Sequence, residues 1–202
     1  MEKKPKLLLA TNNKGKMREY RSLLRGIPYE IVTPAELGIS SGGVEEVGSS
    51  FEENATLKAA AMARQSGLLA LADDSGLEVN ALGGEPGPLS ARYAGEAASD
   101  SDRISFLLSK LKDIPTKNRS ARFRCVIGIA TSDGKVELFS GECRGAVIDT
   151  PRGVHGFGYD PIFFIPELGK TMAELTLEEK NKISHRARAA EKAKAYLIRL
   201  QL

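Results

Sequence analysis

The chain has 202 residues, of which 42% are hydrophobic, and its 29 Lys and Arg against 26 Asp and Glu give a formal net charge of +3. Nothing in this composition indicates disorder, and so small a positive charge gives no argument for nucleic-acid binding. No apolar run approaches the roughly 20 residues that a membrane-spanning helix needs. We therefore expect one cytoplasmic domain over residues 1–202, built as two lobes, that binds neither nucleic acid nor membrane.

The elements predicted in chain order alternate between strands and helices, which is typical of an α/β domain. Apolar and alternating runs indicate strands at 6–10, 29–32, 68–71, 77–79, 121–130, 136–148 and 161–165. Helical spacing indicates helices at 17–24, 50–66, 102–111, 176–182 and 184–200. Ser50 and Glu53 predict a capping box for the second helix, and Gly67 ends it. The sum predicts a mixed, mostly parallel sheet with a long antiparallel hairpin, flanked by helices, with two lobes around a central cleft.

The chain has two cysteines, Cys125 and Cys143, and both fall on the predicted hairpin. If Asp133-Gly134 closes a two-residue turn, Cys125 lies opposite Glu142 and Cys143 points to the other face of the sheet. A disulfide would then need a bulge. Two free thiols fit a reducing cytoplasm.

The segment Ala72-Asp73-Asp74-Ser75-Gly76 follows an apolar run and is expected to form a tight turn at the end of a buried strand. Carboxylates in such a place are costly unless a cation compensates them, and for an Asp pair that cation is usually a hard divalent ion such as Mg2+. Asp, Ser and Gly are also ordinary turn formers. A plain turn without a metal is therefore the alternative.

The polar loop from Thr11 to Lys16 leaves the first strand at the edge of the sheet where ligands of α/β proteins gather. It offers amide groups from Asn12 and Asn13 and charge from its lysines, and the following helix presents unpaired N–H groups. Its spacing is not that of a P-loop. The pattern fits a phosphate site, and it also fits simple capping of the helix by Thr11 and Asn13.

Seven segments stand in order over nearly the whole chain. They are Thr11-x-Asn13-x-x-Lys16-x-x-Glu19, Phe51-Glu52-Glu53-Asn54-Ala55, Ala72-Asp73-Asp74-Ser75-Gly76-Leu77, Gly83-Gly84-x-Pro86-Gly87, Ser90-Ala91-Arg92-Tyr93, Gly156-Phe157-Gly158-Tyr159-Asp160-Pro161-Ile162-Phe163 and Lys182-Ile183-Ser184-His185-Arg186. Together they resemble the inosine/xanthosine triphosphate pyrophosphatase family, whose members remove noncanonical purine nucleotides. Each segment alone is a weak signal, but seven in register are very improbable by accident.

The resemblance implies Mg2+-dependent hydrolysis of ITP, dITP and XTP to the nucleoside monophosphate and pyrophosphate by a homodimer, which keeps these nucleotides out of DNA and RNA. It places the catalytic base and a metal ligand on Asp74, a second metal ligand on Glu46 and a substrate contact on Ser75. The residues implied to line the phosphates are Thr11, Asn12, Asn13, Lys14, Gly15 and Lys16. Those implied to surround the base are Phe157, Gly158, Tyr159 and Asp160, with Lys180, His185 and Arg186 as the other wall.

The chemistry of the reaction is consistent with these roles. Attack of water on the α-phosphorus needs an oriented nucleophile and a place for negative charge, and a metal held by Asp74 and Glu46 would serve both needs. Selectivity for 6-keto purines needs a buried donor that adenine would leave unpaired, and Arg186 with His185 beside it is the expected source. Phe157 is expected to stack on the base, and an ordinary core aromatic is its alternative.

Several points remain open from the sequence. Asp73 is either a second metal ligand or a carboxylate tied into backbone hydrogen bonds, and we favour the latter. His155 is expected to face solvent rather than to contact phosphate. Two rival functions are a nucleotide pyrophosphatase that acts on modified pyrimidine or methylated nucleotides, and a non-catalytic nucleotide- or RNA-binding module. A binding module would have no need of the Glu46 and Asp74 carboxylates beside phosphate, because without metal they repel it.

Overall fold

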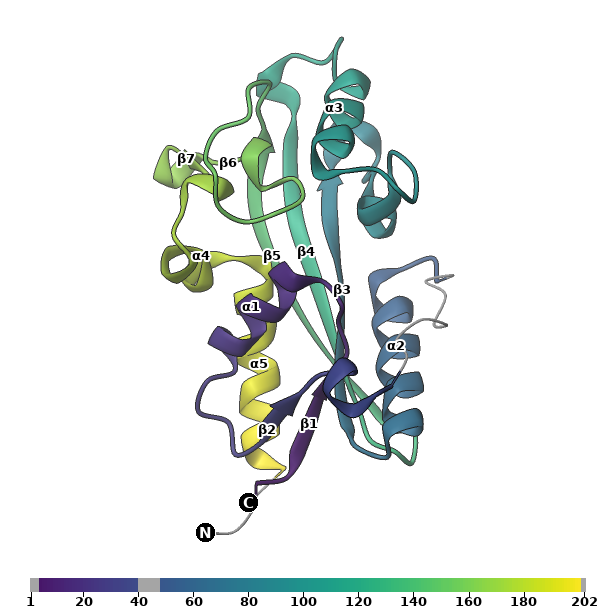
Figure 1. The fold of residues 1–202 in the computed structure, drawn as a ribbon. Coiled ribbons are helices and arrows are strands. Elements are labelled where there is room, and N and C mark those ends of the chain that lie inside the picture. The colour runs from purple at the N-terminus through teal and green to yellow at the C-terminus, as the bar shows by residue number, and fades with distance from the viewer. Residues whose placement is uncertain (1–3, 40–47, 201–202) are drawn as a thin grey trace. The chain divides into compact units, whose positions relative to one another are not determined.

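The structure is a computed structural model that describes residues 4–39 and 48–200. Within these residues a seven-stranded sheet has the strand order β2-β1-β3-β4-β5-β6-β7 (Figure 1). The strands are β1 (Lys6–Leu9), β2 (Glu30–Val32), β3 (Leu69–Val79), β4 (Ser120–Ala130), β5 (Val136–Val147), β6 (Phe163–Ile165) and β7 (Lys170–Thr171). The α-helices are α1 (Lys14–Leu23), α2 (Phe51–Ser66), α3 (Asp100–Lys110), α4 (Leu177–Ile183) and α5 (His185–Arg199). The predicted α/β class is confirmed.

Short 3-10 helices fill several of the connections between these elements. They are Ala35–Leu37, Asn80–Leu82, Gly87–Arg92, Thr116–Asn118, Asp160–Ile162, Pro166–Leu168 and Met172–Glu174. The structure also adds the short strand β7, which no sequence pattern predicted. None of the helices in the described part of the chain is long and apolar enough to cross a membrane.

The sheet is mixed, as predicted, but its parallel part is smaller than expected. β1 pairs in parallel with β2 and with β3, whereas β6 pairs antiparallel with β5 and with β7. The long hairpin of β4 and β5 is confirmed, and the N–H of Thr131 donates to the carbonyl of Lys135 at 3.0 Å to close it. Its turn therefore contains Ser132 as well as the predicted Asp133-Gly134. Parallel neighbours need a crossover of a dozen or more residues, and the connections 131–135 between β4 and β5 and 166–169 between β6 and β7 are too short for one.

The chain divides into two compact units, and β3, β4 and β5 each contribute residues to both. Unit 1 consists of Met1–Asp74, Cys125–Gly141 and Arg186–Leu202. Unit 2 consists of Ser75–Arg124 and Glu142–His185. That the whole chain acts as one functional domain stays a prediction.

In unit 1 strand β1 is buried on both faces, and its successive side chains point to opposite sides of the sheet. Leu7 and Leu9 of β1 pack in one cluster with Tyr20 of α1 and with residues of α5. Leu8 points the other way and packs in a second cluster with Met62 of α2. Figure 1 shows α1 and α5 on one side of β1 and α2 on the other. A strand buried on both faces reads as a continuous apolar run, which is why β1 was visible in the sequence.

Unit 2 has its own hydrophobic core, in which α3 covers the ends of the long strands. Leu107 and Leu111 belong to one buried cluster with Leu77 of β3. Phe123 of β4 and Phe163 of β6 join the same cluster, and their ring centroids lie 4.4 Å apart. The apolar alternation predicted for 121–130 therefore corresponds to one buried face up to Cys125, and beyond it β4 is buried on both faces.

Helix α2 begins and ends where the sequence predicted, but its cap differs in one detail. The side chain of Ser50 accepts from the N–H of Glu53 at 3.2 Å, and Gly67 ends the helix with a φ of 68°. The carboxylate of Glu53 accepts from the N–H of Ser49 at 2.8 Å, which is the residue before the expected partner. The bond predicted from the Glu53 N–H to the Ser50 side chain is therefore confirmed, and the bond predicted from the Ser50 N–H to the Glu53 carboxylate is wrong.

The tight turn predicted at Ala72–Gly76 is wrong, because β3 continues without interruption from Leu69 to Val79. Gly76 lies inside the strand, where an added Cβ would approach Ser90 Oγ to 2.3 Å and the carbonyl oxygen of Gly87 to 2.4 Å. Glycine within a strand often marks such a close approach of another segment. The glycine therefore serves packing here, and the acidic residues before it remain in the sheet because they find partners.

Candidate functional site

The two aspartates of β3 stand at the level where the neighbouring strand ends. β1 pairs in parallel with β3 up to the partners Leu9 and Leu71. β1 then leaves the sheet into the loop Thr11–Lys16, while β3 continues through Asp73 and Asp74. The loop and the two carboxylates therefore share one edge of the parallel pair, as the sequence predicted, although they do so without the predicted turn.

Asp73 is a buried carboxylate surrounded by cations. Its Oδ2 lies 2.9 Å from Lys16 Nζ and 3.8 Å from Arg186 Nε. Burial alone would raise the pKa of Asp73, but the positive charges of Lys16, Arg186 and Lys58 outweigh this effect and lower its pKa to about 2. Which of the two roles left open by the sequence Asp73 has, a second metal ligand or a carboxylate tied into backbone hydrogen bonds, stays a prediction.

Asp74 is held by two side chains from one face of α2. Asn54 Nδ2 donates to its Oδ2 at 2.9 Å, and Lys58 Nζ lies 3.4 Å from its Oδ1. Asn54 and Lys58 are one helical turn apart, so both reach the same spot on the sheet. The sequence analysis missed both residues as part of the site, although their spacing of four within a predicted helix was a usable signal.

The loop Thr11–Lys16 caps the helix that follows it. Asn13 is the N-cap of α1, and its Oδ1 accepts from the N–H of Lys16 at 2.9 Å. Thr11 Oγ1 accepts from the N–H of Asn13 at 3.2 Å. Capping by Asn13 is thus confirmed. Lys14 is exposed beside the first turn of α1, and contact of this loop with phosphate stays a prediction.

Arg186 is buried, so the alternative of a helix-surface charge is wrong. Its side chain is 2% exposed, and its Nη1 donates to Glu19 Oε2 at 2.5 Å. The guanidinium also lies over the ring of Tyr20, 5.8 Å from the centroid. Burial alone would lower the pKa of Arg186, but the charges of Glu19 and Asp73 raise its pKa well above the usual value. A role of Arg186 in reading the base stays a prediction.

We expect Cys125 to be inert toward thiol reagents in the folded protein. Burial, together with the negative charge of Asp73, raises the pKa of this thiol to about 12. The folded protein therefore keeps the thiol neutral at pH 8, whereas the unfolded chain begins to form the reactive thiolate there. The measurement is the rate of reaction with a disulfide reagent in Cys143→Ser, with and without guanidinium, since both cysteines are free. Fast reaction of the folded protein would contradict the expectation.

In unit 2 the loop before η5 (Asp160–Ile162) folds around the carboxylate of Asp160. Asp160 Oδ2 accepts from the N–H of Phe157 at 2.9 Å and from Lys180 Nζ. Lys180 Nζ also lies 5.0 Å from the centroid of the Phe157 ring. An added Cβ at Gly156 would approach Asp160 Oδ2 to 2.0 Å, so the glycine is needed for this fold. Phe157 is only half-buried, which argues against an ordinary core aromatic.

Helix α3 supports the same loop from its first turn. The N–H of Gly158 donates to Asp100 Oδ2 at 2.6 Å. The hydroxyl of Tyr159 donates to the carbonyl of Ser90 at 3.0 Å, and Tyr159 is buried. Gly158 and Tyr159 therefore hold the loop in place. Asp100 is a supporting residue that the sequence analysis missed, because nothing links it to the loop along the chain.

The remaining predicted residues of unit 2 have mixed environments. His185 is buried and stacks on Phe123, with ring centroids 4.8 Å apart and an interplanar angle of 18°. Ser75 directly follows Asp74 on β3 and is half-buried. His155 is exposed, as predicted.

The candidate metal ligands are Asp74 and Glu46, and Glu46 lies outside the described residues. Among residues 4–39 and 48–200, no group of three or more His, Cys, Asp or Glu side chains gathers in a way that could hold a metal. Mg2+ is usually bound through one or two carboxylates together with substrate phosphates. The Asp74 carboxylate can supply one such oxygen ligand, and a metal ion bound there would compete with the Lys58 ammonium group, which lies 3.4 Å from Oδ1.

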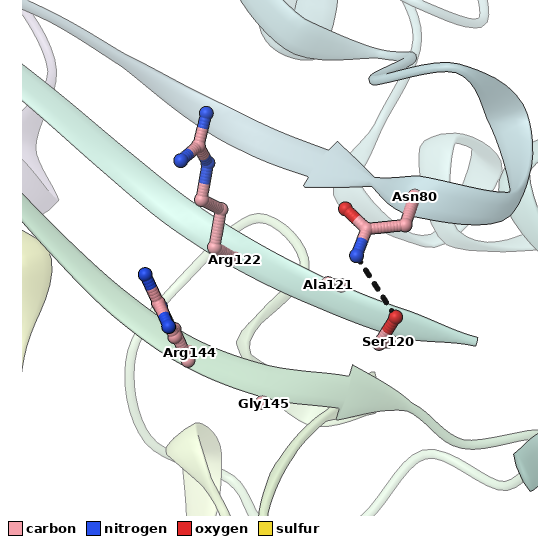
Figure 2. Close-up of a pocket in the computed structure, with 6 residues that line it drawn as sticks. All are labelled: Asn80, Ser120, Ala121, Arg122, Arg144 and Gly145. Carbon is pink, nitrogen blue, oxygen red and sulfur yellow. Dashed lines mark hydrogen bonds between the residues drawn. The ribbon is translucent and has the colours of Figure 1, made fainter. Parts of the chain in front are cut away.

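A separate cavity of about 250 Å³ lies among strand residues of unit 2 (Figure 2). Its lining residues are Asn80, Ser120, Ala121, Arg122, Arg144 and Gly145. Arg122 forms ion pairs with Glu78 and Glu142. Arg144 also pairs with Glu142: its Nε lies 3.0 Å from Glu142 Oε1. Both arginines therefore face carboxylates already, and no residue predicted to bind nucleotide lines this cavity.

Several known proteins are similar to this chain. Residues 7–196 match the model of the Ham1 family. The dITP/XTP pyrophosphatase of Geobacter sulfurreducens is 50% identical over 192 residues, which are 95% of this chain and 96% of that protein. The solved Ham1 protein of Staphylococcus aureus is 45% identical, with a TM-score of 0.84 over 95% of this chain and 97% of its own. The solved HAM1 protein of Coxiella burnetii is 41% identical, with a TM-score of 0.88 over 96% and 99% of the two chains.

Proposed function

The chain belongs to the Ham1 family, and from this membership we propose that it hydrolyses noncanonical purine nucleoside triphosphates to the nucleoside monophosphate and pyrophosphate. The family expected from the seven sequence segments is thereby confirmed. The proposed substrates are dITP, ITP and XTP, in line with the name of the relative that shares half of its residues with this chain. The observation that carries the proposal is the buried Asp74, held by Asn54 and Lys58 on β3 just beyond the point where β1 leaves the sheet.

The proposed role of Asp74 is to orient the attacking water and to accept its proton. A buried carboxylate with fixed donors is suited to this role, because its position does not have to be established anew in each reaction. We propose that Mg2+ is the metal and that Asp74 and Glu46 hold it. When bound, it supplies positive charge to the phosphate oxygens and favours ionisation of water.

The proposed role of the lysines of unit 1 is to neutralise the phosphates. Lys14 is exposed at the start of α1, and Lys16 and Lys58 lie beside the two aspartates. Because Lys16 is paired with Asp73 at 2.9 Å, an incoming phosphate would compete with that carboxylate for the same ammonium group. Backbone N–H groups in the first turn of α1 add further donors for an anion.

The proposed role of the unit 2 loop is to bind the base. Phe157 offers a half-buried ring whose position is fixed through Asp160, and Lys180 lies against the ring. We keep Arg186 and His185 as the proposed donors to the 6-keto oxygen. Both are buried, and a desolvated donor discriminates strongly between a keto and an amino group, because the wrong group leaves it unpaired.

We further propose that the protein is a cytoplasmic homodimer, that residues 1–202 act as one pyrophosphatase domain, and that its activity keeps noncanonical purines out of DNA and RNA. The composition of the chain and its free cysteines support the location. Dimerisation and the cellular role rest on the family alone.

The test is product analysis by ion-exchange chromatography after separate incubation with dITP, ITP, XTP, GTP, ATP and dTTP in the presence of Mg2+. We expect conversion of dITP, ITP or XTP directly to the monophosphate and pyrophosphate, with ATP and GTP slower by about 10²-fold or more. Chelation with EDTA is expected to stop the reaction, and added Mg2+ to restore it. Turnover confined to dTTP would indicate the pyrimidine class, and no turnover of any nucleotide would favour a binding module.

A further inference from the structure

Asn54 is a fully buried polar residue whose amide binds two partners at once. Its Nδ2 donates to Asp74 Oδ2 at 2.9 Å, and its Oδ1 accepts from the N–H of Gly48 at 2.9 Å. The residue is 0% exposed. Burial of a side-chain amide is costly unless both its nitrogen and its oxygen form hydrogen bonds. The Asp74 carboxylate and the Gly48 N–H meet these two needs of Asn54.

The contact with Gly48 decides which way the amide faces. The backbone N–H of Gly48 can only donate, so the oxygen of the amide must point to it and the nitrogen to the Asp74 carboxylate. An added Cβ at position 48 would approach Asn54 Oδ1 to 2.5 Å. A side chain at position 48 would therefore collide with the amide oxygen that the Gly48 N–H now binds, and the amide would have to shift.

The two oxygens of Asp74 consequently have different surroundings. A neutral donor, Asn54, holds Oδ2, whereas the cation of Lys58 lies 3.4 Å from Oδ1. Rotation of the carboxylate would exchange the two oxygens. The amide opposes this rotation because it is fixed at its other end by Gly48 and at its backbone by the helix, where its N–H donates to the carbonyl of Ser50 at 3.1 Å.

We propose that Asn54 is a positioning residue for the hydrolysis: its hydrogen bond to Oδ2 of Asp74 fixes the orientation of the carboxylate and thereby presents Oδ1 as the oxygen that takes part in the chemistry. The inference rests on the proposed function, because it takes Asp74 as the reacting carboxylate. Asn54 acts only through Asp74 and touches no substrate in this role. Residues that orient a reactive group in this way typically contribute about 10–100-fold to activity or metal affinity.

The test compares kcat and KM for dITP in the wild type, Asn54→Leu and Gly48→Ala. Asn54→Leu removes the donor, and Gly48→Ala displaces the amide while all groups of Asn54 and Asp74 remain present. We expect kcat to fall by about 10–100-fold in both variants with KM within about 3-fold of the wild type. If one variant fails to fold, the other still decides the question.

The control is Met62→Ala. Met62 is buried on the same helix, in the hydrophobic cluster that also contains Leu8. This variant is expected to lower the midpoint of thermal unfolding, because it leaves a cavity in the core, without a comparable loss of kcat in the folded protein. If Asn54→Leu and Gly48→Ala lose no more kcat than Met62→Ala, Asn54 only closes the helix start and the positioning role is refuted.

A second readout does not depend on activity. The side-chain amide signal of Asn54 in ¹⁵N–¹H spectra, assigned by its loss in Asn54→Leu, is expected to shift in Asp74→Asn and to stay in place in Met62→Ala. If it ignores the change at Asp74, the contact and the proposal both fail. If the signal shifts but the wild type hydrolyses no nucleotide, the contact between Asn54 and Asp74 is confirmed. The proposed function, and with it the positioning role of Asn54 in hydrolysis, is then refuted. Normal kcat in Asn54→Leu would overturn the positioning role alone.

Discussion

Replacement of Asp74 by Asn is expected to reduce kcat for dITP hydrolysis by about 10²–10⁴-fold while the protein stays folded. The change keeps the shape of the side chain and removes the charge and the proton acceptor. Asn54 and Lys58 contact this carboxylate on a buried strand, so the charge that is lost has a defined place in the site. The measurement is steady-state kinetics with dITP, together with thermal unfolding to show that the variant is intact.

The control for this experiment is Asp113→Asn, which removes one exposed carboxylate. It is expected to leave kcat and KM unchanged. Nucleotide binding by Asp74→Asn should persist, since the lysines and the unit 2 loop are untouched. Turnover by Asp74→Asn within a few-fold of the wild type would refute the role of Asp74, and would reopen the question of which carboxylate accepts the proton.

Replacement of Arg186 by Met is expected to lower the free energy of unfolding by about 3–5 kcal/mol. The change leaves Glu19 buried without the guanidinium that now donates to it, and it removes one of the cations around Asp73. Urea denaturation at neutral pH measures the loss. The double variant Glu19→Gln/Arg186→Met should recover a large part of it, because no uncompensated charge remains between α1 and α5.

The matched control is Arg144→Met, whose side chain is 81% exposed and pairs with Glu142 at the surface. Such a pair contributes about 0–1 kcal/mol. The same variants also test base selection, since loss of a donor to the 6-keto oxygen would lower the preference for dITP over dATP. Unchanged stability of Arg186→Met would contradict the structural role that its burial indicates.

Much of the fold was predictable because its signals are local. The apolar run at Leu7–Leu9 reflects burial on both faces, and the alternation at the start of β4, up to Cys125, reflects one buried face. Ser50 and Gly67 marked the ends of α2 through the side-chain bond and the left-handed backbone that helix ends require. Such features depend on residues a few positions apart, so the sequence displays them directly.

The surroundings of the site were not predictable, because they depend on partners far apart in the chain. Asp73 and Asp74 looked like turn residues, and they stay in a strand only because Lys16, Asn54 and Lys58 reach them from other elements. The family resemblance identified the reacting carboxylate. It did not reveal what holds that carboxylate in place.

Arg186 shows the same limitation in its strongest form. It looked like a surface or substrate-facing charge until the structure placed it against Glu19, 167 positions away in the sequence. No periodicity or spacing along a single sequence reports such a pair. The burial of Arg186 could therefore be learned only from the fold.

The division of the chain into two units also bears on how the protein could have evolved. The backbone passes from one unit to the other inside β3, β4 and β5 and again between His185 and Arg186. No contiguous fragment therefore encodes a whole unit, and no single gene fusion or deletion could add or remove one.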